Sequence, residues 1–437
     1  MPPSQPTETE PLLARSDPIP PNESEEALQD SLKLPKLLFV VAVASICRGI
    51  SMYSRYESFR YSPQFWFTAW VELPGLTINM ELWSTFASLV VSFASVGWWS
   101  AFSDRRGRKP VLFFSLLGPV ILDFIFLTIA KSSLHDDAIS VGLIIEGLLG
   151  GFPTFAAVVH AYASDLSPST LSRTVMFGAI QAAAFIFFIV GGYFGVLADW
   201  ASDLLGLRQG KNFAYSLGII LASSNLTYVY YTLPESLVPL QLEDLPPAAN
   251  STLQYIFAPF STLLRKEPSR RKIFFLAAST VIYSWTLALG PNLVKSTSDA
   301  GYFSFLPRWL LVIIPSVAGV LTWLCIIPAL ASLVKRTYGD TETSGRLLAK
   351  SLAQNSVLLA ALCTLGILIF GGVRSSPLYG LFFFLYPLSV GALPALYALA
   401  ASYWLALGRG AELGALFGAL SIWVSWGGYM SVSSIFS

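Results

Sequence analysis

The chain contains few charged residues for its length. Asp, Glu, Lys and Arg make up 12% of its 437 residues, whereas soluble domains carry about 25%. A net charge of +1, without a concentrated basic face, argues against nucleic acid as a partner. The sequence is instead 54% hydrophobic, with a mean hydropathy of +0.61. This composition indicates a protein embedded in a lipid bilayer.

Residue types that carry enzyme chemistry are scarce as well. There are two histidines and three cysteines, and Cys47, Cys325 and Cys363 all lie in apolar runs, where a thiol behaves as a small hydrophobe. The sequence contains no phosphate-binding loop of the GxxxxGKS type and no nucleophile with a base and an orienting group. We therefore expect no enzyme activity, no cofactor and no metal site.

Apolar runs of about 20 residues, long enough to cross a bilayer as helices, recur along the chain. Six lie in the first part of the sequence, at 37–56, 82–102, 109–130, 139–163, 173–198 and 212–233. Five more follow at 273–294, 309–333, 350–373, 377–403 and 412–435. The sequence therefore predicts an all-α, polytopic membrane protein with eleven transmembrane helices.

Polar segments divide this array. Residues 1–36 predict a disordered tail, 37–233 a six-helix half, 234–271 a central loop and 272–437 a five-helix half. Basic residues near helix ends stay in the cytoplasm, and with the tail inside, the cytoplasmic segments hold 18 basic residues against 8 in the opposite loops. We therefore expect a cytoplasmic tail and central loop. No cleavable signal peptide is expected, so the first helix would direct insertion.

The two halves share a sparse but ordered repeat. Three positions recur 241 residues later: Gly150 as Gly391, Pro153 as Pro394 and Tyr162 as Tyr403. Further along, Arg173 and the segment Gly191–Tyr193 recur 236 residues later. An even number of helices in the first half lets a second copy insert with the same orientation. The pattern therefore predicts two halves related by parallel duplication.

A polar turn between the second and third predicted helices reads SAFSDRRGRKP, from Ser100 to Pro110. It resembles the GxxxDRxGRK signature of the major facilitator superfamily, with Ser100 in place of the first glycine. Together with the six-helix half, the central loop and the repeat, the resemblance covers the whole chain. It implies a two-half helical bundle that moves a solute by alternating access.

The resemblance also implies that this turn latches the cytoplasmic side shut. The residues concerned are Asp104, Arg105, Gly107, Arg108 and Lys109. A carboxylate such as Asp104 can cap a neighbouring helix, arginines can bridge carboxylates between the halves, and glycine permits a tight bend. Alternatively, the basic residues only anchor topology. We favour the gate, because an anchor needs neither Asp nor Gly.

Glycines in the fifth predicted helix, within IVGGYFG, resemble a decayed antiporter motif, GxxxGPxxG. Gly191 and Gly195 fit it, but Gly192 stands in place of Pro and Phe187 in place of Gly. We interpret these glycines as sites of close helix packing. Other predicted packing or hinge positions are Gly150, Pro153 and Pro394.

Three ionisable residues fall inside predicted spans, where a charge is costly and points to function. They are Arg48, Asp123 and Glu146. A carboxylate near the midplane can alternate between protonated and ionised forms as its distance from Arg48 changes, which would couple proton movement to helix rocking. A fixed salt bridge with Arg48 is the alternative, and both remain open.

The predicted spans of the second half contain no comparable charge. Its share of the substrate path is therefore expected to consist of aromatic and amide side chains. The aromatic candidates are Tyr283, Trp285, Tyr386 and Tyr397, with ordinary packing as the alternative role.

Two further segments refine the family resemblance. EGLLGGFPTF, from Glu146, and AYASDLSPSTLSR, from Ala161, resemble the branch of tetracycline-efflux and hippocampus-abundant-type transporters. The main hypothesis is a monomeric secondary transporter of a small organic solute, with proton coupling through Glu146 or Asp123. The alternatives are a transporter-derived receptor or scaffold that moves no substrate, or an inactive truncated transporter.

The tail carries ETEPLL, in which Glu8 precedes Leu12 and Leu13 at the spacing of an acidic dileucine signal. Such signals are read by sorting adaptors, which bind exposed, disordered segments. We therefore expect a sorting adaptor as a partner and a vacuolar, lysosomal or endosomal membrane as the location. The plasma membrane is the alternative.

The repeat also predicts a missing helix. With an offset of 236, Ser437 corresponds to Ala201, just past the fifth helix of the first half. A truncated gene model, an alternative transcript and a genuine eleven-helix protein are the three explanations, and we favour the first.

Overall fold

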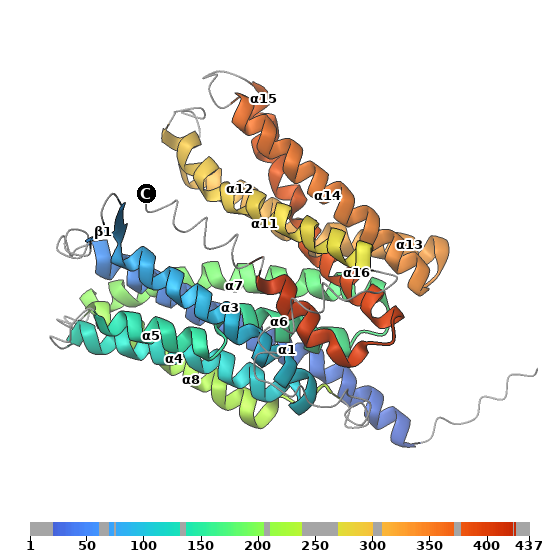
Figure 1. Cartoon of the computed structure of the whole chain (residues 1–437), viewed down its shortest axis with the longest axis horizontal. Helices are drawn as coiled ribbons and strands as arrows, with labels where there is room; N and C mark the ends of the chain where they lie inside the picture. The colour runs from blue at the N-terminus through green and yellow to red at the C-terminus, as the bar shows by residue number, and fades with distance from the viewer. Residues whose placement is uncertain are drawn as a thin grey trace, which may run out of the picture.

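The computed structural model describes residues 21–60, 70–73, 76–131, 137–204, 210–237, 270–299, 308–370, 377–422 and 424 (Figure 1). Every one of the eleven predicted spans contains helix within these residues. This confirms the all-α, polytopic fold class and the helix count. Of the described helices, seven are long and apolar enough to cross a membrane by length and composition alone.

The first-half helices follow the predicted spans closely. They are α1 (Pro21–Arg60), α3 (Met80–Arg106), α4 (Arg108–Lys131), α5 (Asp137–Leu148), α6 (Gly151–Asp165), α7 (Thr170–Leu204) and α8 (Gly210–Thr232). Between α1 and α3, strands β1 (Trp70–Leu73) and β2 (Leu76–Asn79) form an antiparallel hairpin. Hydropathy did not predict this hairpin, because it lies outside the apolar spans.

The first helix is longer than predicted. Because α1 begins at Pro21, residues 21–36 of the expected disordered tail are helical. Proline is well placed in the first turn of a helix, where α1 begins at Pro21. Local sequence therefore extends the membrane helix into the tail.

The second half is more irregular. Its helices are α11 (Arg270–Asp299), α12 (Arg308–Leu321), α13 (Ile327–Tyr338), α14 (Glu342–Phe370), α15 (Pro377–Leu385), α16 (Ala392–Ala406) and an apolar helix at Leu413–Ile422. A π-helical turn at Thr322–Ile326 joins α12 to α13, and a 3-10 segment at Tyr386–Gly391 joins α15 to α16.

The fourth and tenth spans, predicted as continuous helices, are each interrupted. In the fourth, Gly150 and Gly151 have φ angles of 98° and 54°, which glycine adopts most readily, and Pro153 follows in the first turn of α6. Helix α16 begins 241 residues after α6 and, like α6, has 15 residues with a proline near its start, Pro394. The repeat therefore coincides with an interruption at the same place in each half.

Tryptophans stabilise both interruptions. The Trp99 indole N–H donates to the Leu148 carbonyl over 2.9 Å, and the Ser95 hydroxyl donates to the Gly147 carbonyl over 2.6 Å. In the second half, the Trp323 indole donates to the Val390 carbonyl over 3.0 Å. These donors satisfy carbonyl groups beside the interruptions.

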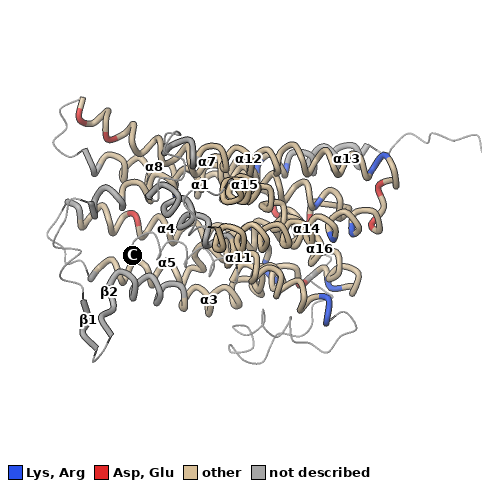
Figure 2. The backbone as a smooth tube through the Cα atoms, turned by 90° about the horizontal axis from the view of Figure 1, so that it is seen from above, with Lys and Arg blue, Asp and Glu red and all other residues tan. Residues whose placement is uncertain are grey.

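The helices form two groups that meet at one end (Figure 1). First-half helices gather on one side and second-half helices on the other, and the groups diverge away from the end where α13, α14 and α16 meet α7. Figure 2 shows Lys and Arg gathered at this same end. We call it the basic end, and it is the end that the positive-inside rule expects on the cytoplasmic side.

Glycines bring α1 and α7 into backbone contact. A Cβ atom on Gly191 would overlap the Ile46 carbonyl, and one on Gly49 would overlap the Phe188 carbonyl. Gly195 packs against the Tyr53 ring, which lies 2.5 Å from the position of its Cβ atom, whereas a Cβ on Gly192 would meet nothing within 4 Å. Neighbouring glycines in one helix thus differ in their surroundings.

This difference predicts opposite effects of alanine. Gly191→Ala forces α1 and α7 apart and should destabilise the protein by roughly 1–3 kcal/mol. Gly192→Ala, the matched control, should be neutral or stabilising by up to about 1 kcal/mol, because alanine favours helix. Thermal unfolding in detergent, followed by tryptophan fluorescence, measures both. Equal effects of the two substitutions would contradict the contact.

Candidate functional site

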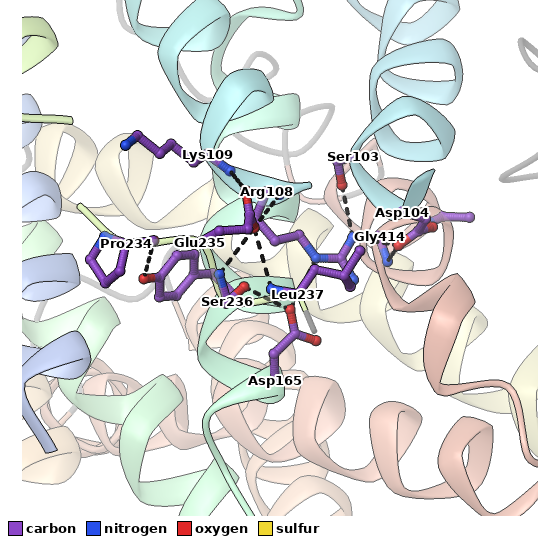
Figure 3. Close-up of polar contacts among 12 residues, drawn as sticks. Ser103, Asp104, Arg108, Lys109, Asp165, Pro234, Glu235, Ser236, Leu237 and Gly414 are labelled. Carbon is purple, nitrogen blue, oxygen red and sulfur yellow. Dashed lines mark hydrogen bonds and ion pairs between the residues drawn. The ribbon is translucent and has the colours of Figure 1, made fainter. Parts of the chain in front are cut away.

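Asp104 joins the two halves at the basic end (Figure 3). Its carboxylate accepts hydrogen bonds from the backbone N–H groups of Gly414, over 2.7 Å, and Ala415, over 2.9 Å. These N–H groups belong to the first turn of the helix at Leu413–Ile422. A first-half side chain therefore caps a second-half helix, where a negative charge is favourable. Asp104 is buried, with 5% of its surface exposed.

Arg108 supplies the positive charge beside this cap. Its guanidinium is fully buried and donates to the carboxylate of Asp104, to the Ser103 hydroxyl over 2.8 Å and to the Asp165 carboxylate over 3.1 Å. Asp165 ends α6, so this one side chain links α3, α4 and α6. A buried guanidinium requires such partners, because an uncompensated charge in the interior is strongly destabilising.

Glu235 caps the start of α4. Its carboxylate accepts the N–H groups of Arg108, over 2.7 Å, and Lys109, over 3.1 Å. Gly107 precedes this first turn with a φ of 107°, and a Cβ there would collide with the Glu235 carboxylate. Glycine is therefore required both for the bend and for the approach of the acid. Arg105 and Lys109 are partly exposed at the edge of the cluster.

The segment after α8 is itself fixed to α6. The Tyr162 hydroxyl donates to the Pro234 carbonyl over 2.7 Å, and the Ser236 hydroxyl donates to the Asp165 carboxylate over 2.9 Å. The turn that begins at Asp104 therefore contacts the ends of α6 and α8 as well as the second half (Figure 3).

A second acidic cap crosses between the halves in the opposite direction. Glu342, at the start of α14, accepts the Thr170 N–H over 3.1 Å and its hydroxyl over 2.5 Å, at the first turn of α7. Arg173 and Arg346 lie 3.7 and 3.5 Å from the same carboxylate. Each half therefore places a carboxylate on the N-terminus of a helix in the other half.

Side chains without formal charge also meet between the halves, close to the caps. The buried His160 of α6 packs against Phe177 and, across the interface, against Tyr397 and Phe417, with ring centroids 4.6 to 6.0 Å apart.

A Cβ on Gly414 would meet the Asp104 carboxylate at 2.7 Å and the Ser103 hydroxyl at 2.8 Å. Glycine therefore lets the capped helix approach α3.

The three charged residues predicted within the membrane lie outside the cluster around Asp104 and Arg108. Asp123 of α4 is buried and accepts a hydrogen bond from the Ser51 hydroxyl of α1 over 2.5 Å. Arg48 is an exposed residue, and its guanidinium lies over the Phe152 ring, 4.5 Å from the ring centroid. Glu146 of α5 is half-buried and packs against Gly118 of α4. The roles of these residues stay predictions.

The aromatic candidates of the second half lie in different surroundings. Tyr283 and Tyr397 are buried, Trp285 is 59% exposed, and the Tyr386 hydroxyl donates to the Thr286 carbonyl over 2.5 Å. The fully buried position of Tyr397 favours packing over contact with a solute.

Sequence reasoning missed Asp165, Glu235 and Glu342. Asp165 and Glu235 each lie two residues past the end of a predicted span, where a carboxylate can cap a helix, and that position was the available signal. Glu342 lies in the loop between the predicted spans 309–333 and 350–373, where no such signal was present. The dileucine residues Glu8, Leu12 and Leu13 lie outside the described residues.

Sequence comparisons find relatives for part of the chain. No protein-family model matches the chain. An MFS-type transporter, avaJ, of Aspergillus versicolor is 35% identical over 138 residues, 31% of this chain and 25% of the relative. A proton-coupled folate transporter of Bos taurus is 27% identical over 138 residues, 32% of this chain and 28% of the relative. The matched region thus spans about a quarter of the length of each curated relative.

Solved structures match over nearly the whole chain. The human organic anion transporter MFSD10 aligns with a TM-score of 0.59 at 18% identity, over 91% of this chain and 98% of its own. The fucose:proton symporter FucP of E. coli aligns with a TM-score of 0.61 at 11% identity, over 93% and 91%. The protein therefore has the major facilitator fold, as its turn motif indicated, and is an integral membrane protein.

The buried cluster predicts a large effect of removing Asp104. Asp104→Ala leaves the Gly414 and Ala415 N–H groups uncapped and takes one of two carboxylates from Arg108, so we expect a destabilisation of about 3–5 kcal/mol. The matched control is Asp203→Ala, which removes an exposed acid from the last turn of α7 and should change little. Thermal unfolding in detergent measures both. A similar melting temperature for the two variants would contradict the role of Asp104.

Proposed function

We propose that the protein is a secondary transporter, acting as a monomer, that moves a small organic solute across a membrane by alternating access. The carrying observation is the pair of reciprocal caps that close the basic end, Asp104 on Gly414 and Glu342 on Thr170, while the helix groups diverge toward the other end (Figure 1). The relatives whose names describe transporters support the same class of function.

Such caps suit a gate because water can replace the capping carboxylate at the helix N-terminus. A carboxylate on a helix N-terminus contributes about 1 kcal/mol, and water can replace it when the helices part. A solute that binds the state open at the basic end more tightly would shift the population toward that state. Asp104, Arg105, Gly107, Arg108 and Lys109 would then form the gate.

We also propose proton coupling through a carboxylate in the membrane. Asp123 accepts the Ser51 hydroxyl of α1, so movement of α1 relative to α4 would alter how well its charged form is stabilised. Glu146 packs against Gly118 of α4, so movement of α5 relative to α4 would likewise change its surroundings.

Uptake into vesicles tests transport and coupling together. Proteoliposomes exposed to a yeast metabolite extract should retain at least one solute, identified by mass spectrometry, above protein-free vesicles and more strongly under a pH gradient. Glu146→Gln should remove the gradient dependence, because the amide cannot be protonated near neutral pH. Asp340→Asn, at an exposed acid outside the spans, is the matched control. Unchanged pH dependence in both Glu146→Gln and Asp123→Asn would contradict the coupling, and no retained solute would contradict transport.

We further propose sorting to a vacuolar, lysosomal or endosomal membrane through Glu8, Leu12 and Leu13. Leu12→Ala with Leu13→Ala removes the side chains an adaptor would bind, so a fluorescently tagged variant should move to the plasma membrane. Ser4→Ala with Thr7→Ala is the matched control in the same tail. Identical localisation of the dileucine variant and the parent would show that the segment is not a signal.

A further inference from the structure

Two glycines let a second-half helix lie directly against α3. Gly414 and Gly418 are one turn apart in the helix at Leu413–Ile422, so they share a face. A Cβ atom on Gly418 would overlap the hydroxyl of Ser100 and lie 3.0 Å from the Ser100 Cβ atom. Ser100 belongs to α3, one turn before Asp104. This contact between the halves therefore lies one turn farther from the basic end than the Asp104 cap.

The hydroxyl of Ser100 is enclosed by this contact. The residue is fully buried, and its hydroxyl oxygen has no hydrogen-bond partner in the part of the chain that the structure describes. The buried serines Ser45, Ser115 and Ser421 instead donate to a carbonyl of their own helix. The Ser100 hydroxyl is directed at Gly418. Ser100 is also the position at which the turn departs from the GxxxDRxGRK signature, where glycine would bring no hydroxyl into the contact.

An enclosed hydroxyl without a partner makes the closed state less favourable. The hydroxyl gives up hydrogen bonds to water when the halves meet, and the protein supplies none in return. Because α3 and the capped helix belong to different halves, parting of the halves at the basic end would return the hydroxyl to water. Asp104 acts in the opposite sense, because its carboxylate gains the N–H groups of Gly414 and Ala415 when the halves meet.

We propose that Ser100 sets the balance of the gate, because its hydroxyl, enclosed against Gly418, lowers the population of the state closed at the basic end. Gly418 is the matching residue, since glycine alone leaves room for a serine side chain at this distance. The inference rests on the proposed transport function, because it concerns the closed and open states of that cycle.

Thiol labelling at a separate point of the interface measures how often the basic end opens. The reporter is Ala331→Cys in full-length protein in detergent, carrying Cys47→Ala, Cys325→Ala and Cys363→Ala. Ala331 is buried in α13, in an apolar cluster with Leu171 of α7, so a charged maleimide reaches this position when the halves part. When closing is faster than labelling, the labelling rate is proportional to the population of the open state.

Removing the hydroxyl should favour the closed state. Ser100→Ala deletes the oxygen and keeps the Cβ atom, so the labelling rate at position 331 should fall about tenfold. The matched control is Ser115→Ala, whose buried hydroxyl bonds within its own helix, and it should leave the rate unchanged. A parental rate in Ser100→Ala, or an equal fall in Ser115→Ala, would overturn the proposal.

Gly418→Ala tests the same contact from the second half. Its Cβ atom would collide with Ser100, so the labelling rate at position 331 should rise about tenfold. Adding Ser100→Gly removes both atoms that obstruct the new methyl group, and should bring the rate back to the parental value or below. A double variant that still labels as fast as Gly418→Ala would contradict the role of this contact.

A second reporter separates opening of the whole interface from local loosening. Val96→Cys lies in α3, where Val96 is buried and faces Gly418, and its labelling rate should change by the same factors as that at position 331. A change at position 96 alone would overturn the proposal. The labelling needs no solute and no gradient, so a protein that shows these ratios but retains no solute would fail as a transporter while keeping the role of Ser100.

Discussion

The closed end of this molecule depends on one buried cation. Arg108 is fully enclosed between helices, and a guanidinium in that position is tolerated only with carboxylates around it. Asp104 and Asp165 supply them, and Asp104 uses its remaining hydrogen-bonding capacity on the first turn of a helix from the other half. The electrostatic requirement of one side chain thus determines where α3, α6 and the helix at Leu413–Ile422 meet.

The second cap shows that the arrangement is reciprocal. Glu342 of the second half serves the first turn of α7, as Asp104 of the first half serves Gly414. Both contacts place a carboxylate on the positive end of a helix. That helix end loses little stabilisation when water replaces the carboxylate. Two modest contacts, one from each half, thus join the halves at this end.

Most of the architecture was predictable from sequence, because the bilayer demands apolar segments of fixed length and all eleven were visible as hydropathy. The turn around Asp104 and Gly107 was recognisable too, because its signature is contained in one short segment, from Ser100 to Pro110. The partners of that turn were not. Glu235 lies 127 residues from Arg108, and an acid beside a span end resembles any other polar loop residue until the fold brings it to a helix N-terminus. Gly150 and Pro153 were predicted as packing or hinge positions, but the break in the helix was not predicted, since apolar content continues through it.

The backbone contact between α1 and α7 differs from anything described in the second half. With Gly49 and Gly191 in the crossing, the two helices have no side-chain layer that could slide. The second half instead contains a π-helical turn and a 3-10 segment, in its second and fourth spans, which are places where a helix can flex. Any rearrangement would therefore carry α1 and α7 together as one rigid unit, whereas bending in the second half would be concentrated at these two segments.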